Sequence, residues 1–120
     1  EMNSGSSYEA MERYLEKNKK PPKALFISSD ATAAGILKSI REHGFLVPGD
    51  CNIVTYNNTT FSESSTPPLD SIEVYLKESA KEATFALERF WNAEKLPRKI
   101  VIPCSLVIRG SIKKQENNDR

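Results

Sequence analysis

The chain has 120 residues, 38% of them hydrophobic and 28% charged, which is typical of one soluble globular domain and too apolar for a disordered segment. Its 17 lysines and arginines against 16 aspartates and glutamates give a formal net charge of +1, so the chain lacks the basic surface with which proteins hold a nucleic-acid backbone. No apolar run approaches the roughly 20 residues of a membrane-spanning helix, and the two cysteines, Cys51 and Cys104, lie far apart without further ligands at metal-binding spacing, which disfavours a metal site or a disulfide and fits a reducing cytoplasm.

Helix and strand patterns alternate along the first half of the chain. Residues 8–15 carry apolar side chains at helical spacing and precede a pair of prolines, which predicts an amphipathic helix. Residues 24–27 are a short continuous apolar run, typical of a strand that is buried on both faces. Residues 31–43 form a second helical stripe with Asp30 as the expected N-cap, and the β-branched residues 52–56 predict a second strand.

The second half continues with a polar loop, a strand and a long helix. Residues 59–68 are rich in Ser, Thr and Pro and predict a loop, and residues 71–74 predict a third strand. Apolar positions at helical spacing from Leu76 onwards predict a long amphipathic helix that ends before Pro97. Residues 100–108 predict a last strand region interrupted by a proline.

Two further expectations concern the end of the chain. The aromatic pair Phe90 and Trp91 lies on the apolar stripe of the long helix, so we expect both rings to be core residues rather than a binding surface. Residues 112–120 are mostly charged and polar, and we expect them to form a mobile tail.

Helices that separate buried-type strands predict an α/β fold with a mainly parallel sheet. In such sheets ligands bind beyond the carboxyl ends of the strands. Ser29 and Asp30 follow the first predicted strand, and Asn57 follows the second. Their hydroxyl, carboxylate and amide groups suit a neutral polyol such as a sugar, which needs both donors and acceptors. The alternative is that Asp30 only caps a helix and that Asn57 only forms a turn.

Enzymatic activity is not expected. The single histidine, His43, falls at a helix end, where a cation complements the helix dipole. No serine lies in a nucleophile-elbow motif, and no paired acids occur at a recognisable spacing. Asp30 could be imagined as a phosphoacceptor, but no acidic pair closes an earlier strand to hold the magnesium ion that this chemistry needs. We therefore predict neither a cofactor nor a metal.

Six short segments, in this order, resemble motifs of the lactose-repressor/galactose-repressor type of transcriptional regulator. For example, residues 44–50 read G-F-L-V-P-G-D, similar to the family's G-x-x-V-P-x-D turn, and residues 103–111 read P-C-S-L-V-I-R-G-S, similar to its P-x-x-L-V-x-R-G-S segment. The other four segments are residues 22–30, 33–38, 52–58 and 67–72.

The resemblance implies the C-terminal part of a periplasmic-binding-protein-like effector domain. Its ligand contacts would come from Ser29 or Asp30 and from Asn57, which stands where most members have an aspartate. Val74 and Leu76 fall at positions where other members contact the ligand, so apolar packing against a sugar ring is expected there, with core packing as the alternative. The sequence Y-N-N-T also resembles the maltose-type repressors of the family, which suggests a maltose-like sugar.

The resemblance also implies a larger parent protein. Residues 1–111 would be part of the effector domain, and the DNA-binding headpiece and the first half of that domain would be absent. The parent would be a cytoplasmic homodimer that binds a sugar, and operator DNA only through the missing headpiece. Residues 76–99 would pack with the missing lobe, so we expect this chain alone to cover their apolar stripe by folding back, dimerising or exchanging elements. The alternative function is the sugar-binding protein of a transporter.

Overall fold

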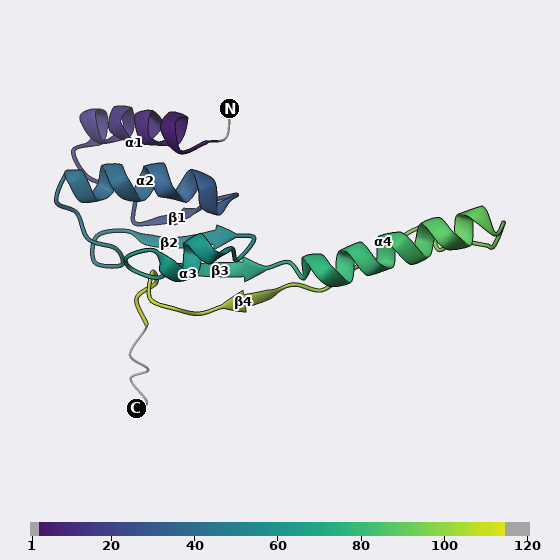
Figure 1. Ribbon diagram of the computed structural model, residues 1–120. Helices are drawn as coiled ribbons and strands as arrows, with labels where there is room; N and C mark the ends of the chain where they lie inside the picture. Colours follow the sequence, from purple (N-terminus) through teal and green to yellow (C-terminus); the bar gives the residue numbers. More distant parts are fainter. Residues whose placement is uncertain (1–2, 115–120) are drawn as a thin grey trace.

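The computed structural model describes residues 3–114, and these residues form four helices and one four-stranded sheet (Figure 1). In chain order the elements are α1 (Ser4–Asn18), β1 (Ala24–Phe26), α2 (Asp30–Glu42), β2 (Asn52–Tyr56), α3 (Thr60–Ser64), β3 (Asp70–Glu73), α4 (Leu76–Trp91) and β4 (Ser105–Val107).

The sheet has the strand order β1-β2-β3-β4. The first three strands are parallel, and β4 pairs with β3 in the antiparallel direction. The predicted α/β fold with a mainly parallel sheet is therefore confirmed, as are the two helices and two strands of the first half. The prediction of a plain loop at residues 59–68 is wrong in part, because α3 lies within it. Five residues are too few to give the apolar periodicity from which a helix is recognised.

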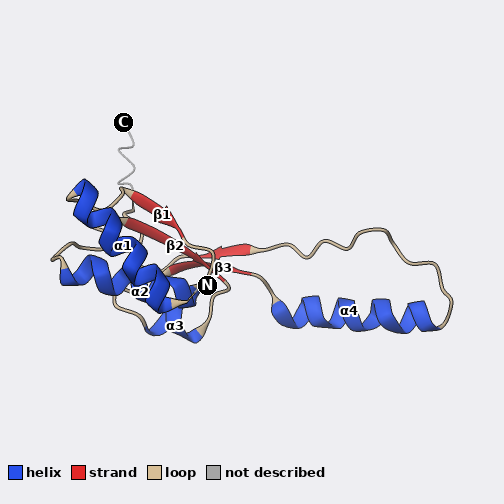
Figure 2. Ribbon diagram, turned by 90° about the horizontal axis from the view of Figure 1, so that it is seen from above, coloured by secondary structure: helices blue, strands red, loops and turns tan. Residues whose placement is uncertain are grey.

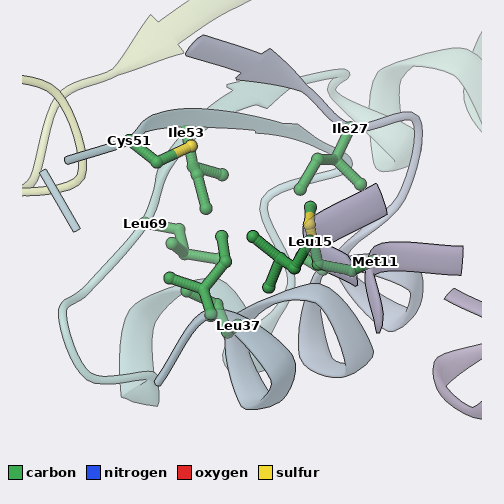
Figure 3. Packing of buried hydrophobic residues seen from close by; sticks show 9 residues of the cluster. Met11, Leu15, Ile27, Leu37, Cys51, Ile53 and Leu69 are labelled. Atoms are coloured by element: carbon green, nitrogen blue, oxygen red, sulfur yellow. The ribbon is translucent and has the colours of Figure 1, made fainter. Parts of the chain in front are cut away.

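Helices α1, α2 and α3 lie on one side of the sheet (Figure 2). The apolar stripe of α2 faces the sheet through Leu37 and Ile40, and α1 adds Met11 and Leu15. These side chains and Ile53 of β2 belong to one buried cluster. In Figure 3, Leu37 and Ile53 lie around the middle of this core and Met11 lies near Ile27. The remaining members of the core cluster are Ile27, Ala33, Cys51 and Leu69.

Close approach of α1 and α2 depends on Gly35. A Cβ atom at this position would overlap the backbone carbonyl oxygen of Ser4 and the hydroxyl of Ser7. Glycine is unfavourable inside a helix, so its presence in the middle of α2 has a packing reason. The small residue allows the two helix backbones to lie side by side.

The opposite face of the sheet is open. Along β2, Ile53 and Thr55 are buried whereas Tyr56 is exposed, and Phe26 of β1 is also exposed. The rings of Phe26 and Tyr56 form an edge-to-face pair with centroids 6.4 Å apart. The expectation that β1 is buried on both faces is therefore wrong in this structure, because the helices that cover the sheet all lie on its other side (Figure 2).

The end of the described chain is held firmly against the sheet. The predicted strand region at residues 100–108 contains a strand only at Ser105–Val107. Ser111, immediately before the predicted mobile tail, is fully buried and bonds to Asp70. Of the tail itself, residues 112–114 are described, and the backbone N–H of Lys113 donates to Asn52 Oδ1 at 2.8 Å. Residues 115–120 lie outside the described residues.

Helix α4 extends away from the body of the molecule (Figures 1 and 2). It has no buried residue, and Phe90 and Trp91 are 66% and 78% exposed. The prediction that these two rings belong to the core is wrong, although the helix and its apolar stripe are present. Of the three expected ways of covering the stripe, folding back is not seen among the described residues, and dimerisation and exchange of elements stay predictions. The stripe has the right periodicity for burial, but the described chain has nothing that packs against it.

Within residues 3–114, none of the helices combines the length and the apolar character needed to cross a membrane.

Candidate functional site

The carboxyl ends of the three parallel strands bring the predicted contact residues to one edge of the sheet. Ser29 lies beyond the end of β1, Asn57 follows β2 directly, and Val74 follows β3 directly. Phe26 is in register with Val54, and Tyr56 with Ile72, so the three strands end at neighbouring positions. This edge is where open parallel sheets bind their ligands.

Ser29 is the N-cap of α2. Its hydroxyl accepts a hydrogen bond from the backbone N–H of Thr32 at 3.2 Å and lies 2.9 Å from the Thr32 hydroxyl. The prediction that Asp30 is the N-cap is wrong by one residue, because Asp30 is already the first residue of the helix. Serine and aspartate are both favoured near a helix start, so composition alone does not separate the two positions.

Asp30 holds the loop that follows β2. Its side chain is almost completely buried, and Oδ2 accepts hydrogen bonds from the backbone N–H and the hydroxyl of Thr59 at 2.7 and 2.6 Å. The other oxygen, Oδ1, is buried without a hydrogen-bond partner among the described residues. The carboxylate therefore links the start of α2 to the loop after β2, and its contact with a ligand stays a prediction.

Asn57 and Asn58 turn the chain sharply at the end of β2. Their φ angles are 100° and 49°, in the left-handed region that asparagine tolerates better than most residues with a side chain. The backbone N–H of Asn57 donates to the carbonyl of Ile72 at 3.1 Å, which fixes the turn to β3. Both side chains are half-buried. The turn predicted from these residues is present, and it positions the Asn57 amide at the strand edge.

Sequence reasoning missed a polar cluster beside this turn, formed by Asn58, Glu73 and Arg109. The Asn58 amide donates to Glu73 Oε2 at 2.8 Å and accepts from Arg109 Nη2 at 2.6 Å. The hydrogen bonds from Asn58 and from the backbone of Tyr75 hold the pKa of Glu73 below its ordinary value. The three residues are far apart in sequence, so no local pattern predicts their meeting.

Arg109 is positioned by a second buried group, Asp70. Asp70 Oδ1 accepts from the backbone N–H of Arg109 at 2.6 Å, and Oδ2 accepts from the backbone N–H of Ser111 at 2.8 Å. The guanidinium also donates to the carbonyl of Leu69 at 2.9 Å. A fully buried carboxylate with several donors is well satisfied, so it fixes the segment after β4 to the start of β3. The only sequence signal was the R-G-S motif of the resemblance.

Val74 and Leu76 lie at the exit from the sheet into α4. Val74 is half-buried, and Leu76 is 68% exposed. Between them, Tyr75 has a φ of 48°, and its hydroxyl lies 2.9 Å from the hydroxyl of Ser105 on the returning strand. The core alternative for Leu76 is therefore wrong in this structure, and its contact with a ligand stays a prediction.

Hydrogen-bonding groups and apolar side chains dominate this edge, which suits a ligand with several hydroxyl groups. Among residues 3–114, no group of three or more His, Cys, Asp and Glu side chains is arranged to hold a metal ion.

The chain is similar to known transcriptional regulators. Residues 1–112 match the family described as periplasmic binding protein-like domain. The chain is 33% identical over 109 residues to the HTH-type transcriptional regulator GalR of Streptococcus thermophilus, covering 90% of this chain and 33% of that protein. It is 36% identical over 90 residues to the HTH-type transcriptional repressor MelR of Bacillus subtilis, covering 75% of this chain and 26% of that protein.

Solved structures agree with this assignment. A putative transcriptional regulator LacI from Bacillus cereus subsp. cytotoxis superposes with a TM-score of 0.83 at 32% identity, over 94% of this chain and 40% of that one. A complex of the transcriptional regulator CelR with cellobiose gives a TM-score of 0.80 at 26% identity, over 92% of this chain and 34% of that one. The chain thus spans at most about a third of the length of these two curated relatives.

Proposed function

The chain belongs to the periplasmic binding protein-like family found in LacI/GalR-type transcriptional regulators, and we propose that it supplies part of the sugar-sensing domain of a cytoplasmic repressor. The observation that carries this proposal is the position of Ser29, Asn57 and Val74 beyond the carboxyl ends of three neighbouring parallel strands. The relatives' regulatory role supports it. Operator DNA would be bound by a headpiece elsewhere in the parent protein.

The proposed ligand is a neutral sugar, with a maltose-like disaccharide as the first candidate. An amide at position 57 offers a donor as well as an acceptor and carries no charge, so it suits a sugar hydroxyl better than a cationic group. The similar CelR structure is a complex with cellobiose, which is also a glucose disaccharide. Val74 and Leu76, at the same exit from the sheet, would pack against the apolar face of a sugar ring.

In the proposed mechanism, helix α4 moves when the ligand binds. Its exposed apolar side chains, among them Phe90 and Trp91, are ones that a larger parent would cover with the rest of the effector domain. The chain leaves the sheet after β3 and returns through β4, so both connections to α4 pass the ligand edge. Sugar bound between the lobes would change their angle, with a coupling free energy on the order of 1 to 3 kcal/mol.

We also propose that the parent is a homodimer. Helices α2 and α3 share a surface depression lined by Lys38, Arg41, Phe61 and Thr66. This mixed polar and apolar surface has the composition of a subunit contact rather than of a core. A sugar-binding protein of a transporter is the alternative function, and it would share the ligand edge but not the response of DNA binding to sugar.

The experiment compares Asn57→Ala with Asn18→Ala in the full-length parent protein, using maltose and cellobiose as calorimetric probes. Asn18 is an exposed asparagine at the end of α1, far from the strand edge, and its amide donates only to a helix carbonyl. We expect Asn57→Ala to abolish sugar binding without unfolding the protein, and Asn18→Ala to retain it. Retained affinity in Asn57→Ala would contradict the assignment of the site.

A further inference from the structure

We propose that Glu73 is a positioning residue that ties the Asn57–Asn58 turn to the entry of α4, so that ligand contact at the turn and movement of α4 occur together. This inference deepens the proposed function and rests on it. It assigns the Glu73 carboxylate a role other than direct contact with the ligand.

The two oxygens of Glu73 have different partners. Oε2 accepts from the Asn58 side-chain amide at 2.8 Å, and Oε1 accepts from the backbone N–H of Tyr75 at 2.8 Å. Asn58 follows β2, whereas Tyr75 is the N-cap of α4. One carboxylate at the end of β3 therefore joins the ligand turn to the N-cap residue of α4.

The Asn58 side chain is fixed from both ends. Its oxygen accepts from Arg109 Nη2 at 2.6 Å while its nitrogen donates to Glu73, so the amide has one satisfied orientation. The Asn58 backbone N–H donates to the hydroxyl of Ser71 at 3.0 Å. A change in the turn next to Asn57 must therefore either move the Glu73 carboxylate or break its charge-assisted hydrogen bond with Asn58.

Tyr75 extends the tie to the returning segment. Its backbone is in the left-handed region, with a φ of 48°, a conformation that is unfavourable for a residue with a large side chain and that needs support from its surroundings. The Tyr75 hydroxyl lies 2.9 Å from the hydroxyl of Ser105. The contacts Asn58 to Glu73, Glu73 to Tyr75 and Tyr75 to Ser105 thus cross both connections between the sheet and α4.

Glutamate is needed for this geometry because each of its oxygens is an acceptor. In Glu73→Gln only one side-chain oxygen remains, and the new NH₂ group faces either the Asn58 side-chain amide or the Tyr75 N–H, both of which are donors. Either the Asn58 amide or the Tyr75 N–H then loses its acceptor. The substitution changes few atoms and keeps the shape of the side chain, so it tests the tie rather than the packing.

The test measures backbone amide hydrogen exchange in the full-length parent, without ligand and with maltose or cellobiose as probe. The variants are Glu73→Gln and Asn58→Ala, and the matched control is Asp50→Asn. Asp50 also accepts a backbone N–H, that of Leu46 at 2.8 Å, but at the opposite end of β2. The Ile53 amide, which donates to the carbonyl of Ser111 in the core, reports global opening.

Without ligand, we expect Asn58→Ala to raise exchange of the Tyr75 amide at least threefold relative to Ile53, although the Tyr75 acceptor is still present. We expect Glu73→Gln to raise exchange at both Asn58 and Tyr75, and Asp50→Asn to change neither. If Asn58→Ala leaves Tyr75 unchanged and Glu73→Gln affects Tyr75 alone, Glu73 is only a local cap and the proposal is overturned. A uniform increase that includes Ile53 would also overturn it, because that result indicates a purely structural role.

With sugar, we expect exchange in wild type to slow both at the turn and at Tyr75, and in Glu73→Gln to slow at the turn only. Equal slowing at Tyr75 in both proteins would overturn the proposal. If neither sugar binds wild type, the maltose-like ligand assignment fails, and the ligand-free comparison still decides whether Glu73 ties the two segments.

Discussion

Replacement of Asp30 separates the two roles that this residue could have. Asp30→Ala removes the acceptor of both Thr59 hydrogen bonds, which measure 2.7 and 2.6 Å. A hydrogen bond to a charged group contributes about 1.5 to 3 kcal/mol when buried. Thr59 is exposed, so water replaces part of each bond, and we take about 1 to 1.5 kcal/mol for each. Loss of a carboxylate in the first turn of α2 adds about 0.5 kcal/mol.

The expected cost of Asp30→Ala is therefore about 3 kcal/mol, or about 12 °C in Tm for a domain of this size. Asp30→Asn keeps one oxygen as the acceptor for Thr59 and removes the negative charge of the buried side chain. In the native side chain, Oδ1 is buried without a hydrogen-bond partner among the described residues. We expect Asp30→Asn to cost about 1 to 2 kcal/mol, less than Asp30→Ala, because the acceptor for Thr59 is kept. The removal of a half-satisfied buried charge is opposed by the lost dipole contact and by the new NH₂ group, which is buried where Oδ1 has no partner among the described residues.

Urea denaturation measures both free energies of unfolding, with Asp50→Ala as control because that change removes a single exposed hydrogen bond. Equal destabilisation by the alanine and asparagine variants would refute the reasoning, since it would mean that the charge, and not the link to Thr59, stabilises the fold. Sugar titration of Asp30→Asn in the full-length parent then tests the ligand role. Loss of binding with unchanged stability would identify Asp30 as a ligand contact after all.

Three further predictions concern packing, thiol chemistry and pH. Gly35→Ala should destabilise the protein by about 1 to 3 kcal/mol in urea denaturation, because the new Cβ overlaps the backbone of α1; an unchanged midpoint would contradict this packing. A thiol reagent at pH 8 should label the exposed Cys104 and spare the buried Cys51. Burial and the nearby Asp50 raise the pKa of the Cys51 thiol to about 11, so little thiolate is present at pH 8. Equal labelling of both cysteines in the native protein would contradict the burial of Cys51. The stabilising effect of ionised Glu73 should be complete near neutral pH and decline as the pH falls through its lowered pKa. The difference in the free energy of unfolding between wild type and Glu73→Gln should therefore shrink in acid. A difference that grew in acid would contradict the lowered pKa of Glu73.

The spacing of apolar residues, and the glycines and prolines between the segments, located most of the helices and strands from the sequence. The predicted helix at residues 31–43 is found at Asp30–Glu42, and the predicted strand at residues 52–56 is found at Asn52–Tyr56. Both patterns are local, and the helix stripe and the β-branched run each match one backbone period. The same reasoning placed Ser29 and Asn57 at one edge, because alternating helices and strands predict parallel strands and the carboxyl ends of parallel strands lie at the same edge.

Local patterns failed where burial depends on distant partners. The stripe that predicts a buried Trp91 is real, but a stripe only states which face of α4 is apolar and not whether another element covers it. In a chain that spans at most about a third of these two curated relatives, that covering element need not be present. The motif resemblance indicated that the missing lobe would normally pack with this face of α4, but the chain alone does not fold back over it.

The sequence by itself determined the α/β class, the strand edge that holds Ser29 and Asn57, and the kinship to LacI/GalR-type transcriptional regulators. Only the tertiary structure revealed that Asp30 bonds to Thr59 and that Glu73 meets Asn58 and Tyr75. The physical reason is the range of the forces that decide each feature. Periodic apolar patterns act within one element, whereas hydrogen bonds between side chains depend on the register of strands and loops that lie far apart in the chain.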